Sequence, residues 1–510
     1  MESFTDIKIE FEFSDDTWTD VYDDVIGSIQ VSAGIRGYGL LDRVAGTGTC
    51  KLTLENRGNV YTPGHTSCTS GFEEGTPFRI RFTYDGKTAI KYYGRIKDIK
   101  VKPGAGITYY TDVIVTDYID LLATHELELP EFAEDKTLDN IVARVIDETS
   151  IPAANVVSGY GNSIFETVFD TTSARTIALQ EIAKATISEL GYVYVIPYVG
   201  NPLDRIVAGD ENVMVEGRYS SYLFETSSIT LTDEDVVGME LQYAGNYFND
   251  IRTIVYPRQV DSAATSVLFE IVDPINVQPG DTVYYTGRFR DPNQEAQQVS
   301  GIDMVTPVAT TDYLFNTAES GGGSDITTDL VVTATYGANG VKYTLTNNNA
   351  AAGYVTKLQA RGKGVYVYRP VEYNAEYADG ITADGRKTLT LSMPYQNDPN
   401  VGISFADALL KLYKTKKLTI KNFTVEVNKS STLMDWFIDY SFRQRVTLDF
   451  DDIGFDEDYL TQGYDMTLLI NGNVIVKYYL LSTDYLPSND TWRLGITGKT
   501  ELGTTTILGF

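Results

Sequence analysis

The feature that most constrains the fold is a strand pattern punctuated by tight turns. Residues 79–84 alternate in polarity with a period of two, which is typical of a half-buried β-strand. They lead directly into an Asp-Gly dipeptide, and Asp-Gly and Asn-Gly tolerate the positive φ that short hairpin turns need. Three such dipeptides stand between strand-like runs: Asp85-Gly86, Asn339-Gly340 and Asn471-Gly472. The sequence therefore predicts at least three β-hairpins.

Composition favours the same fold class. The chain has 510 residues, of which 43% are hydrophobic, so it can form about three or four domains with packed cores. Tyrosine occurs 36 times and suits strands as well as surfaces that meet other subunits. We expect a multidomain protein that is mainly β with a small α/β part.

Helical patterns are few. Residues 137–149 place five apolar side chains on one face, with acidic residues near the start. A second helix is predicted from a Ser173 cap through Leu190, with Gly191 as its stop. A third is predicted over about 405–415, with Ala408, Leu409 and Leu412 facing inward.

Changes in pattern suggest five segments. The run 319–325, which is rich in glycine and serine, is interpreted as a flexible connector. The predicted segments are an N-terminal β-domain at 1–125, an α/β domain with two helices at 126–225, a second β-domain at 226–320, a small β-unit plus helix at 321–417, and a C-terminal β-domain at 418–510.

The net charge of −29 argues against binding nucleic acid or an anionic membrane surface. Two interpretations of the charge stay open: solubility alone, or a negative passage along which DNA slides without sticking. The N-terminus has no basic region followed by an apolar one, and no apolar run is long enough to span a bilayer, so we expect a soluble, unprocessed chain with no membrane insertion.

The two cysteines, Cys50 and Cys68, rule out a disulfide scaffold and a cysteine zinc site. A single bridge between them and two free thiols both remain open, and a reducing compartment favours the thiols. The only histidines, His65 and His125, are too few for a two-histidine zinc peptidase motif, and we expect each to be solvated or bonded locally.

Two segments imitate functional motifs. Residues 495–500 end in Gly-Lys-Thr, but a phosphate-binding loop needs glycine where the chain has Arg493, and a helix where residues 504–508 suggest a strand. The acidic run 449–458 resembles a calcium loop in part, yet Ile453 and Leu460 occupy ligand positions, so a solvated acidic loop is favoured. No catalytic, cofactor-binding or metal-binding residue is assigned, and we expect no enzyme activity.

The order of several short motifs resembles tail-hub proteins, also called baseplate hub or minor tail proteins, of long-tailed bacteriophages. In the first 125 residues the resemblance rests on residues 18–25, 34–37, 41–56, 60–63, 75–80, 93–96 and 116–123. It continues through residues 173–183, 190–195, 249–258, 358–362, 384–391, the third predicted helix and 492–503. It thus covers nearly the whole chain.

This resemblance implies β-barrel or sandwich domains and a homotrimer that closes the distal end of a tail tube. Two similar β-domains per chain would form a pseudo-sixfold ring that frames a channel for DNA exit. We expect these ring domains at about 1–125 and 226–320 plus returning strands. The implied partners are the distal tail protein, the tail tube and tail-tip or fibre proteins, and the implied location is the virion tail tip, after assembly in the host cytoplasm.

Two other functions stay open. Trp18, Trp436 and Trp492 could stack on sugars in a carbohydrate-binding module for host attachment, although core or interface packing is the commoner role of tryptophan. A wall hydrolase is the third possibility, but the chain has no hydrolase motif and no appended peptidase or muramidase module.

Overall fold

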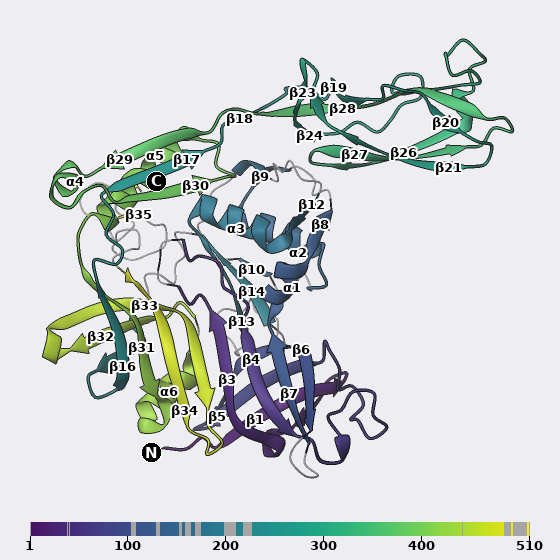
Figure 1. Cartoon of the computed structure of the whole chain (residues 1–510). Helices are drawn as coiled ribbons and strands as arrows, with labels where there is room; N and C mark the ends of the chain where they lie inside the picture. Colours follow the sequence, from purple (N-terminus) through teal and green to yellow (C-terminus); the bar gives the residue numbers. More distant parts are fainter. Residues whose placement is uncertain are drawn as a thin grey trace.

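The fold divides into five parts: in Figure 1 two β-units lie at the bottom, an α/β layer lies above the right-hand one, a connector sheet lies at the upper left and an arm at the upper right. The computed structural model describes residues 2–37, 39, 41–103, 109–128, 133–151, 156–158, 165–168, 175–197, 211–217, 227–440, 442–483, 491–492 and 507–508. We call the parts the first β-unit, the second β-unit, the α/β layer, the connector sheet and the arm.

The first β-unit forms because its strands alternate between buried and open side chains. On β5, for example, Phe78, Ile80 and Phe82 are fully buried, while the residues between them are partly open. Its elements are β1 (Asp6–Ser14), β2 (Thr17–Asp20), β3 (Val25–Gly34), β4 (Thr49–Glu55), β5 (Pro77–Tyr84), β6 (Lys87–Pro103), β7 (Tyr109–Thr116) and α1 (Tyr118–Thr124).

The second β-unit is built mostly from the C-terminal part of the chain, with two strands that precede the connector sheet. Its elements are β15 (Thr230–Thr232), β16 (Val236–Tyr243), β31 (Leu418–Glu426), α6 (Ser431–Asp439), β32 (Arg445–Phe450), β33 (Phe455–Leu468) and β34 (Val474–Ser482). β33 pairs with β3, so both units share one 13-stranded sheet in the order β16-β31-β34-β33-β3-β4-β7-β6-β5-β1-β2. β32 also pairs with β33, and β15 pairs with β32.

The α/β layer lies above the first β-unit and shares its hydrophobic core (Figure 1). Helix α3 packs beside α1 and α2 and also lies against the connector sheet at β30. The elements of the layer are β8 (Glu126–Glu128), β9 (Ala133–Lys136), α2 (Leu138–Asp147), β10 (Val156–Ser158), β11 (Phe165–Val168), β12 (Arg175–Ile177), α3 (Ala178–Glu189), β13 (Tyr192–Pro197) and β14 (Glu211–Glu216).

The connector sheet has the order β29-β17-β30 and is covered by helix α5, which buries Phe405 and Leu409 against Ile251 and Leu391. β17 runs antiparallel to β29 and parallel to β30. The elements are β17 (Asp250–Val255), β29 (Val371–Glu376), α4 (Ala378–Asp384), β30 (Thr388–Met393) and α5 (Pro399–Tyr413).

The arm extends from the connector sheet to the right of Figure 1 and has a hydrophobic core of its own. Its central strand is the long β28, with which five other strands pair. The strands are β18 (Arg258–Val260), β19 (Ser266–Glu270), β20 (Ile275–Val277), β21 (Thr282–Arg288), β22 (Arg290–Asp291), β23 (Gln294–Gln298), β24 (Ser300–Ile302), β25 (Tyr313–Asn316), β26 (Leu330–Gly337), β27 (Gly340–Asn347) and β28 (Gly353–Val367). The short pair β35 (Thr491–Trp492) and β36 (Ile507–Leu508) completes the described strands.

All three predicted hairpins form, although two turns differ from the prediction. The β5–β6 turn uses Asp85 and Gly86, both at positive φ. The β26–β27 turn is shifted by one residue, because Gly340 already pairs with Gly337 and Ala338 takes the turn position with Asn339. The β33–β34 turn is longer than two residues, since pairing ends at Leu468 and resumes at Val474.

The predicted helices form with corrected ends. The first is confirmed as α2, and its five predicted apolar side chains are buried. The second begins at Ala178, because residues 175–177 pair as a strand with β8, and Ser173 lies outside the described residues. Leu190 takes the left-handed C-cap, whereas Gly191 is needed because a Cβ there would come within 2.5 Å of the Glu216 carbonyl oxygen.

The third predicted helix is α5 and begins at Pro399, well before residue 405. The side chain of Asp398 accepts a hydrogen bond from the backbone N–H of Asn400 at 2.8 Å and caps the helix. Leu409 is buried as predicted, Leu412 is partly buried, but Ala408 is exposed. Helices α1, α4 and α6 were not predicted.

The run 319–325 does not connect two separate bodies, so that interpretation is wrong. It is a closed loop between β25 and the start of β26. The Thr317 N–H donates to the Ser324 carbonyl at 3.1 Å, and the Asn316 side chain accepts from the backbone N–H groups of Ala318 and Gly323. Its two ends therefore lie side by side.

Strand pairing crosses the predicted segment boundaries. Apart from the β22–β23 hairpin, every described strand between residues 226 and 320 pairs with a strand outside that range. The long 13-stranded sheet is open, and none of the described sheets closes into a barrel. The fold is mainly β with several sheets, and the five segment boundaries remain a prediction.

Candidate functional site

The first structural feature is the joint between the two β-units, where β3 pairs with β33. β3 and β33 pair antiparallel from Ile29 opposite Leu468 to Gly34 opposite Gly463. A backbone pairing of this kind fixes the register and direction of two units that are more than 400 residues apart in the chain. It makes one sheet out of two folded bodies.

Glycine is required where this joint is tightest. A Cβ on Gly463 would lie 2.6 Å from the Ile35 carbonyl oxygen, and a Cβ on Gly34 would lie 2.6 Å from the Gln462 carbonyl oxygen. Gly34 also has a φ of +78°, which side-chain-bearing residues rarely adopt. The backbones of the two units thus approach more closely at Gly34 and Gly463 than residues with a Cβ atom would allow.

A buried lysine makes a second contact between the two β-units. Lys91 on β6 is 3% exposed, and its ammonium donates to the carbonyl oxygens of Ile438 and Tyr440, each at 3.0 Å, at the C-terminal end of helix α6. Burial lowers the pKa of Lys91 to about 7. The ring of Phe437 adds apolar contact with Phe4 and Phe82 of the first β-unit.

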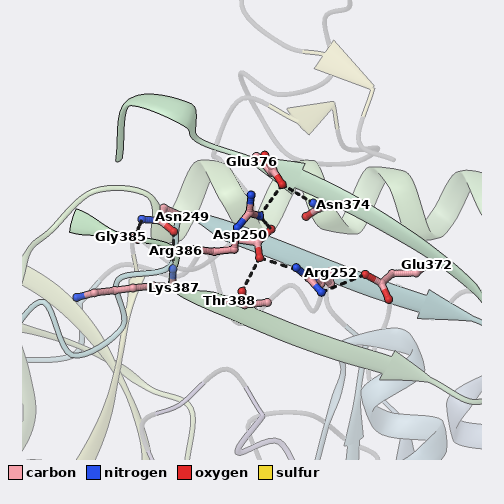
Figure 2. Close-up of polar contacts among 10 residues, drawn as sticks. All are labelled: Asn249, Asp250, Arg252, Glu372, Asn374, Glu376, Gly385, Arg386, Lys387 and Thr388. Carbon is pink, nitrogen blue, oxygen red and sulfur yellow. Dashed lines mark hydrogen bonds and ion pairs between the residues drawn. The ribbon is translucent and has the colours of Figure 1, made fainter. Parts of the chain in front are cut away.

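A polar cluster, which we call the junction cluster, lies at the start of the connector sheet (Figure 2). The Asp250 carboxylate is fully buried and lies 2.9 Å from Nη1 of Arg386 and 3.3 Å from Nε of Arg252. The Thr388 hydroxyl also donates to it. Arg386 reaches on to the Glu376 carboxylate at 2.5 Å, so the cluster spans all three connector strands.

A second set of bonds ties the same place to the loop before β30. The side chain of Asn249 donates to the Gly385 carbonyl at 2.8 Å and accepts from the Lys387 N–H at 2.7 Å (Figure 2). The Tyr247 hydroxyl donates to Asp384, which also pairs with Lys416 shortly before β31. The cluster therefore links the connector sheet to the chain segment that returns to the second β-unit.

The charges of the junction cluster are matched. Burial alone would raise the pKa of Asp250, but hydrogen bonds from Thr388 and Arg386 and the charge of Arg252 lower it below its usual value. The hydrogen bond from Arg386 likewise lowers the pKa of Glu376. These groups stay ionised at neutral pH, and the arrangement suits a structural tie between strands.

Two ends of the 13-stranded sheet are open edges. Among the described residues, β16 pairs only with β31 and β2 pairs only with β1, while β15 ends the branch that leaves β33 through β32. On β16, Val237 is 55% exposed and Tyr243 is 67% exposed, and Leu241 is also exposed. An eight-residue edge with exposed apolar side chains favours pairing with another chain.

The residues considered for chemistry at the sequence level are not brought together. His65 is bonded locally, as predicted, because its Nδ1 accepts from the Ser67 N–H at 3.1 Å. His125 lies at the end of α1, and both Cys50 and Cys68 are free thiols. Burial raises the pKa of the Cys50 thiol well above its usual value.

The two imitation motifs give no site among the described residues. Residues 493–500, with the Gly-Lys-Thr run, lie outside them. In the acidic run, Asp458 is paired with Arg445 at 3.2 Å and bonded to Thr447, so this end of the run is held by the sheet and is not simply solvated. No group of three or more His, Cys, Asp or Glu in the described part of the chain is placed to hold a metal ion.

The tryptophans differ in their surroundings. Trp436 is 6% exposed and packs among Phe423, Tyr440 and Tyr478, so it cannot stack on a sugar. Trp18 lies partly open on β2 with the Arg79 guanidinium 3.9 Å above its ring. The side chain of Trp492 lies outside the described residues.

Sequence reasoning missed the roles of Lys91 and of the junction cluster. A signal for the cluster existed, since residues 249–258 and 384–391 both belong to the resemblance motifs. These two segments pair in parallel register, with Asp250 opposite Thr388. Nothing in the local sequence of Lys91 distinguishes it from an exposed lysine on a strand.

Comparison with known proteins gives structural neighbours only. No protein-family model and no curated protein matches the sequence. A tail protein from Neisseria meningitidis is similar over 94% of this chain and 99% of its own, with a TM-score of 0.48 and 9% identity. The 43 kDa tail protein of prophage MuSo2 from Shewanella oneidensis is similar over 94% of this chain and 100% of its own, with a TM-score of 0.49 and 9% identity.

A prophage tail protein from Listeria monocytogenes is similar over 93% of this chain and 94% of its own, with a TM-score of 0.40 and 9% identity. These neighbours are tail proteins. Separately, the described helices include none with the length and apolar content needed to cross a bilayer.

Proposed function

We propose that the protein is a structural subunit of a phage-type tail and forms the hub at the distal end of the tail tube. The observation that carries this proposal is the single 13-stranded sheet, in which one chain joins two β-units edge to edge. Each unit brings its own strands and one helix, α1 or α6. The resemblance of the sequence motifs to tail hubs supports the same function.

The arrangement suits a ring. A closed ring of identical subunits needs two different surfaces on each subunit that match one another. The opposite edges of the sheet, at β16 and β2, are two such surfaces on one chain. Three chains with two β-units each would give six similar positions around an axis, so we propose a homotrimer that matches a sixfold tube.

The ring-forming parts in this proposal are the first β-unit and the second β-unit. The latter combines residues 230–243 with residues 418–482. The ring would frame the DNA exit channel, and the net charge of −29 per chain disfavours adhesion of DNA to its surface. The distal tail protein, the tail tube and tail-tip or fibre proteins are the proposed neighbours, at the tail tip of the virion.

The experiment is the native mass of the purified chain combined with electron micrographs of the same sample. We expect a trimer and a threefold ring with a central hole. Leu241→Lys on the free β16 edge should abolish the ring, because a charge at the edge opposes strand pairing. The matched control is Val272→Lys, which changes a 93% exposed valine on the arm and should leave the ring intact.

A chain that stays monomeric at high concentration, both alone and with tail tubes added, would contradict the proposal. A ring that forms equally well with Leu241→Lys would contradict the role of β16 while leaving the trimer in place. The two outcomes are distinguished by the same mass measurement.

A further inference from the structure

The outer face of one sheet in the arm has an unusual composition. Strands β21, β27 and β26 form a three-stranded antiparallel sheet near the far end of the arm (Figure 1). On its inner face, Val341, Tyr343 and Leu345 are fully buried in the core of the arm. On the outer face, the side chains that alternate with these include Thr282, Thr286, Thr333, Thr335, Thr344 and Thr346.

We call this outer face the threonine face. The threonines stand in cross-strand rows, and the hydroxyl oxygens of Thr282 and Thr346 are 3.0 Å apart. Tyr284 lies between the two threonines of β21, opposite Thr344, and is 68% exposed. Each hydroxyl can donate and accept hydrogen bonds, so the face offers many polar contacts around one open aromatic ring.

The charge of the threonine face contrasts with that of the chain. Acidic residues outnumber basic ones by 70 to 41 in the whole sequence, yet none of the outward residues of these three strands is acidic. Lys342, exposed on the central strand opposite Thr286, and Arg288, exposed at the end of β21, are its charged residues. An anionic ligand is therefore attracted here and repelled by most of the remaining surface.

We propose that the threonine face binds a glycan that carries acidic groups. The hydroxyl rows match the alternating donors and acceptors of a sugar chain, and the Tyr284 ring matches the apolar face of a sugar ring. Lys342 and Arg288 supply the positive charge for a carboxylate or phosphate on the glycan. A protein partner would call for a more apolar centre than a face on which Tyr284 and Val331 are the large exposed hydrophobic residues.

The experiment is electrophoresis of the full chain through native gels that contain polygalacturonate, an acidic polysaccharide, or neutral dextran. We expect retardation by polygalacturonate that weakens as salt increases, and none by dextran. The variants Tyr284→Ala and Lys342→Glu should each weaken binding by about tenfold or more. The matched control is Tyr368→Ala, which removes a 52% exposed tyrosine of the arm outside the threonine face.

Melting curves of the variants establish that the arm is folded. The absence of retardation, equal retardation by dextran, or unchanged binding in both variants would each overturn the proposal. A change in native mass caused by Tyr284→Ala would overturn it as well, because the threonine face would then be a contact between protein chains. Glycan binding is independent of the proposed hub function, since it is measured whether or not the chain forms a ring.

Discussion

The joint between the β-units and the junction cluster of the connector sheet both hold distant parts of the chain together, but by opposite means. The joint uses backbone pairing, two glycines and apolar packing around α6. The junction cluster uses a buried carboxylate and two arginines. The joint is therefore sensitive to a change in side-chain size, and the junction cluster is sensitive to a change in charge. Substitutions that separate the two effects test this comparison.

The largest effect is expected at the joint. Gly463→Val places side-chain atoms where the backbone of Ile35 already lies at 2.6 Å, and backbone cannot move aside as a side chain can. We expect a loss of about 3 kcal/mol in the free energy of unfolding, at the upper end of what overpacking typically costs. Hydrogen exchange should show the loss of protection in β3 and β33. Gly238→Ala on β16 is the control, because nothing lies within 4 Å of its Cβ position, and equal effects in both variants would contradict the close-approach argument.

The next effect is expected in the junction cluster. Asp250→Asn keeps the shape but leaves Arg252 and Arg386 without their shared charge, at a cost of about 2 kcal/mol. Measured by hydrogen exchange, the protection of backbone amides should be lost in β17 and retained in β3. Glu372→Gln, at the exposed rim of the same cluster, is the control and should change little.

Acid should reproduce part of the Asp250→Asn effect in the native chain. The pKa of Asp250 is lower in the folded than in the unfolded chain, so its contribution is present above the unfolded value. It is lost as the pH falls through the folded value. Exchange in β17 that stays unchanged on acidification would contradict this assignment.

The fourth prediction concerns the lysine at the joint. The pKa of Lys91 is about 7 in the folded chain and higher when unfolded, so above pH about 7 the unfolded chain binds more protons. Stability should therefore rise between about pH 7 and 9, by no more than about 1.4 kcal/mol per pH unit from this group. Lys91→Met should flatten the rise in denaturation measured across that range. An unchanged slope would contradict the role of Lys91.

The smallest effect is expected at the periphery of the junction cluster. Lys416 pairs with Asp384 in a solvent-exposed position, where water and salt screen the attraction. Lys416→Gln should lower the melting temperature slightly at low salt, and high salt should remove the difference from the native chain. A shift as large as that of Asp250→Asn would show that charge pairing outside the buried carboxylate also holds the connector.

Much of the local structure was predictable from the sequence. Alternating polarity predicted the strands, and the Asp85-Gly86 and Asn-Gly dipeptides predicted the hairpins. The helical period of residues 137–149 predicted α2. The errors came where tertiary contacts overrode local preference. Residues 175–177 form a strand because β8 lies beside them, and the loop 319–325 closes because Asn316 bonds across it.

The parts of the candidate site were less predictable. The motifs around Asp250 and Arg386 were visible in the sequence, but not that one segment pairs with the other. β16 gave no signal of an open edge, since an edge strand and a central strand can share one pattern. The threonine face likewise depends on which strands become neighbours in the arm.

The sequence by itself determined the fold class, the acidic charge and the places of the three hairpins, because these depend on composition and on residues close together in the chain. Only the tertiary structure decided that strands at the two ends of the chain form one sheet and that Lys91 is buried. It also decided that Asp250 meets Arg386. Those outcomes depend on backbone pairing between segments more than a hundred residues apart, and the pairing rules are nearly the same for every strand.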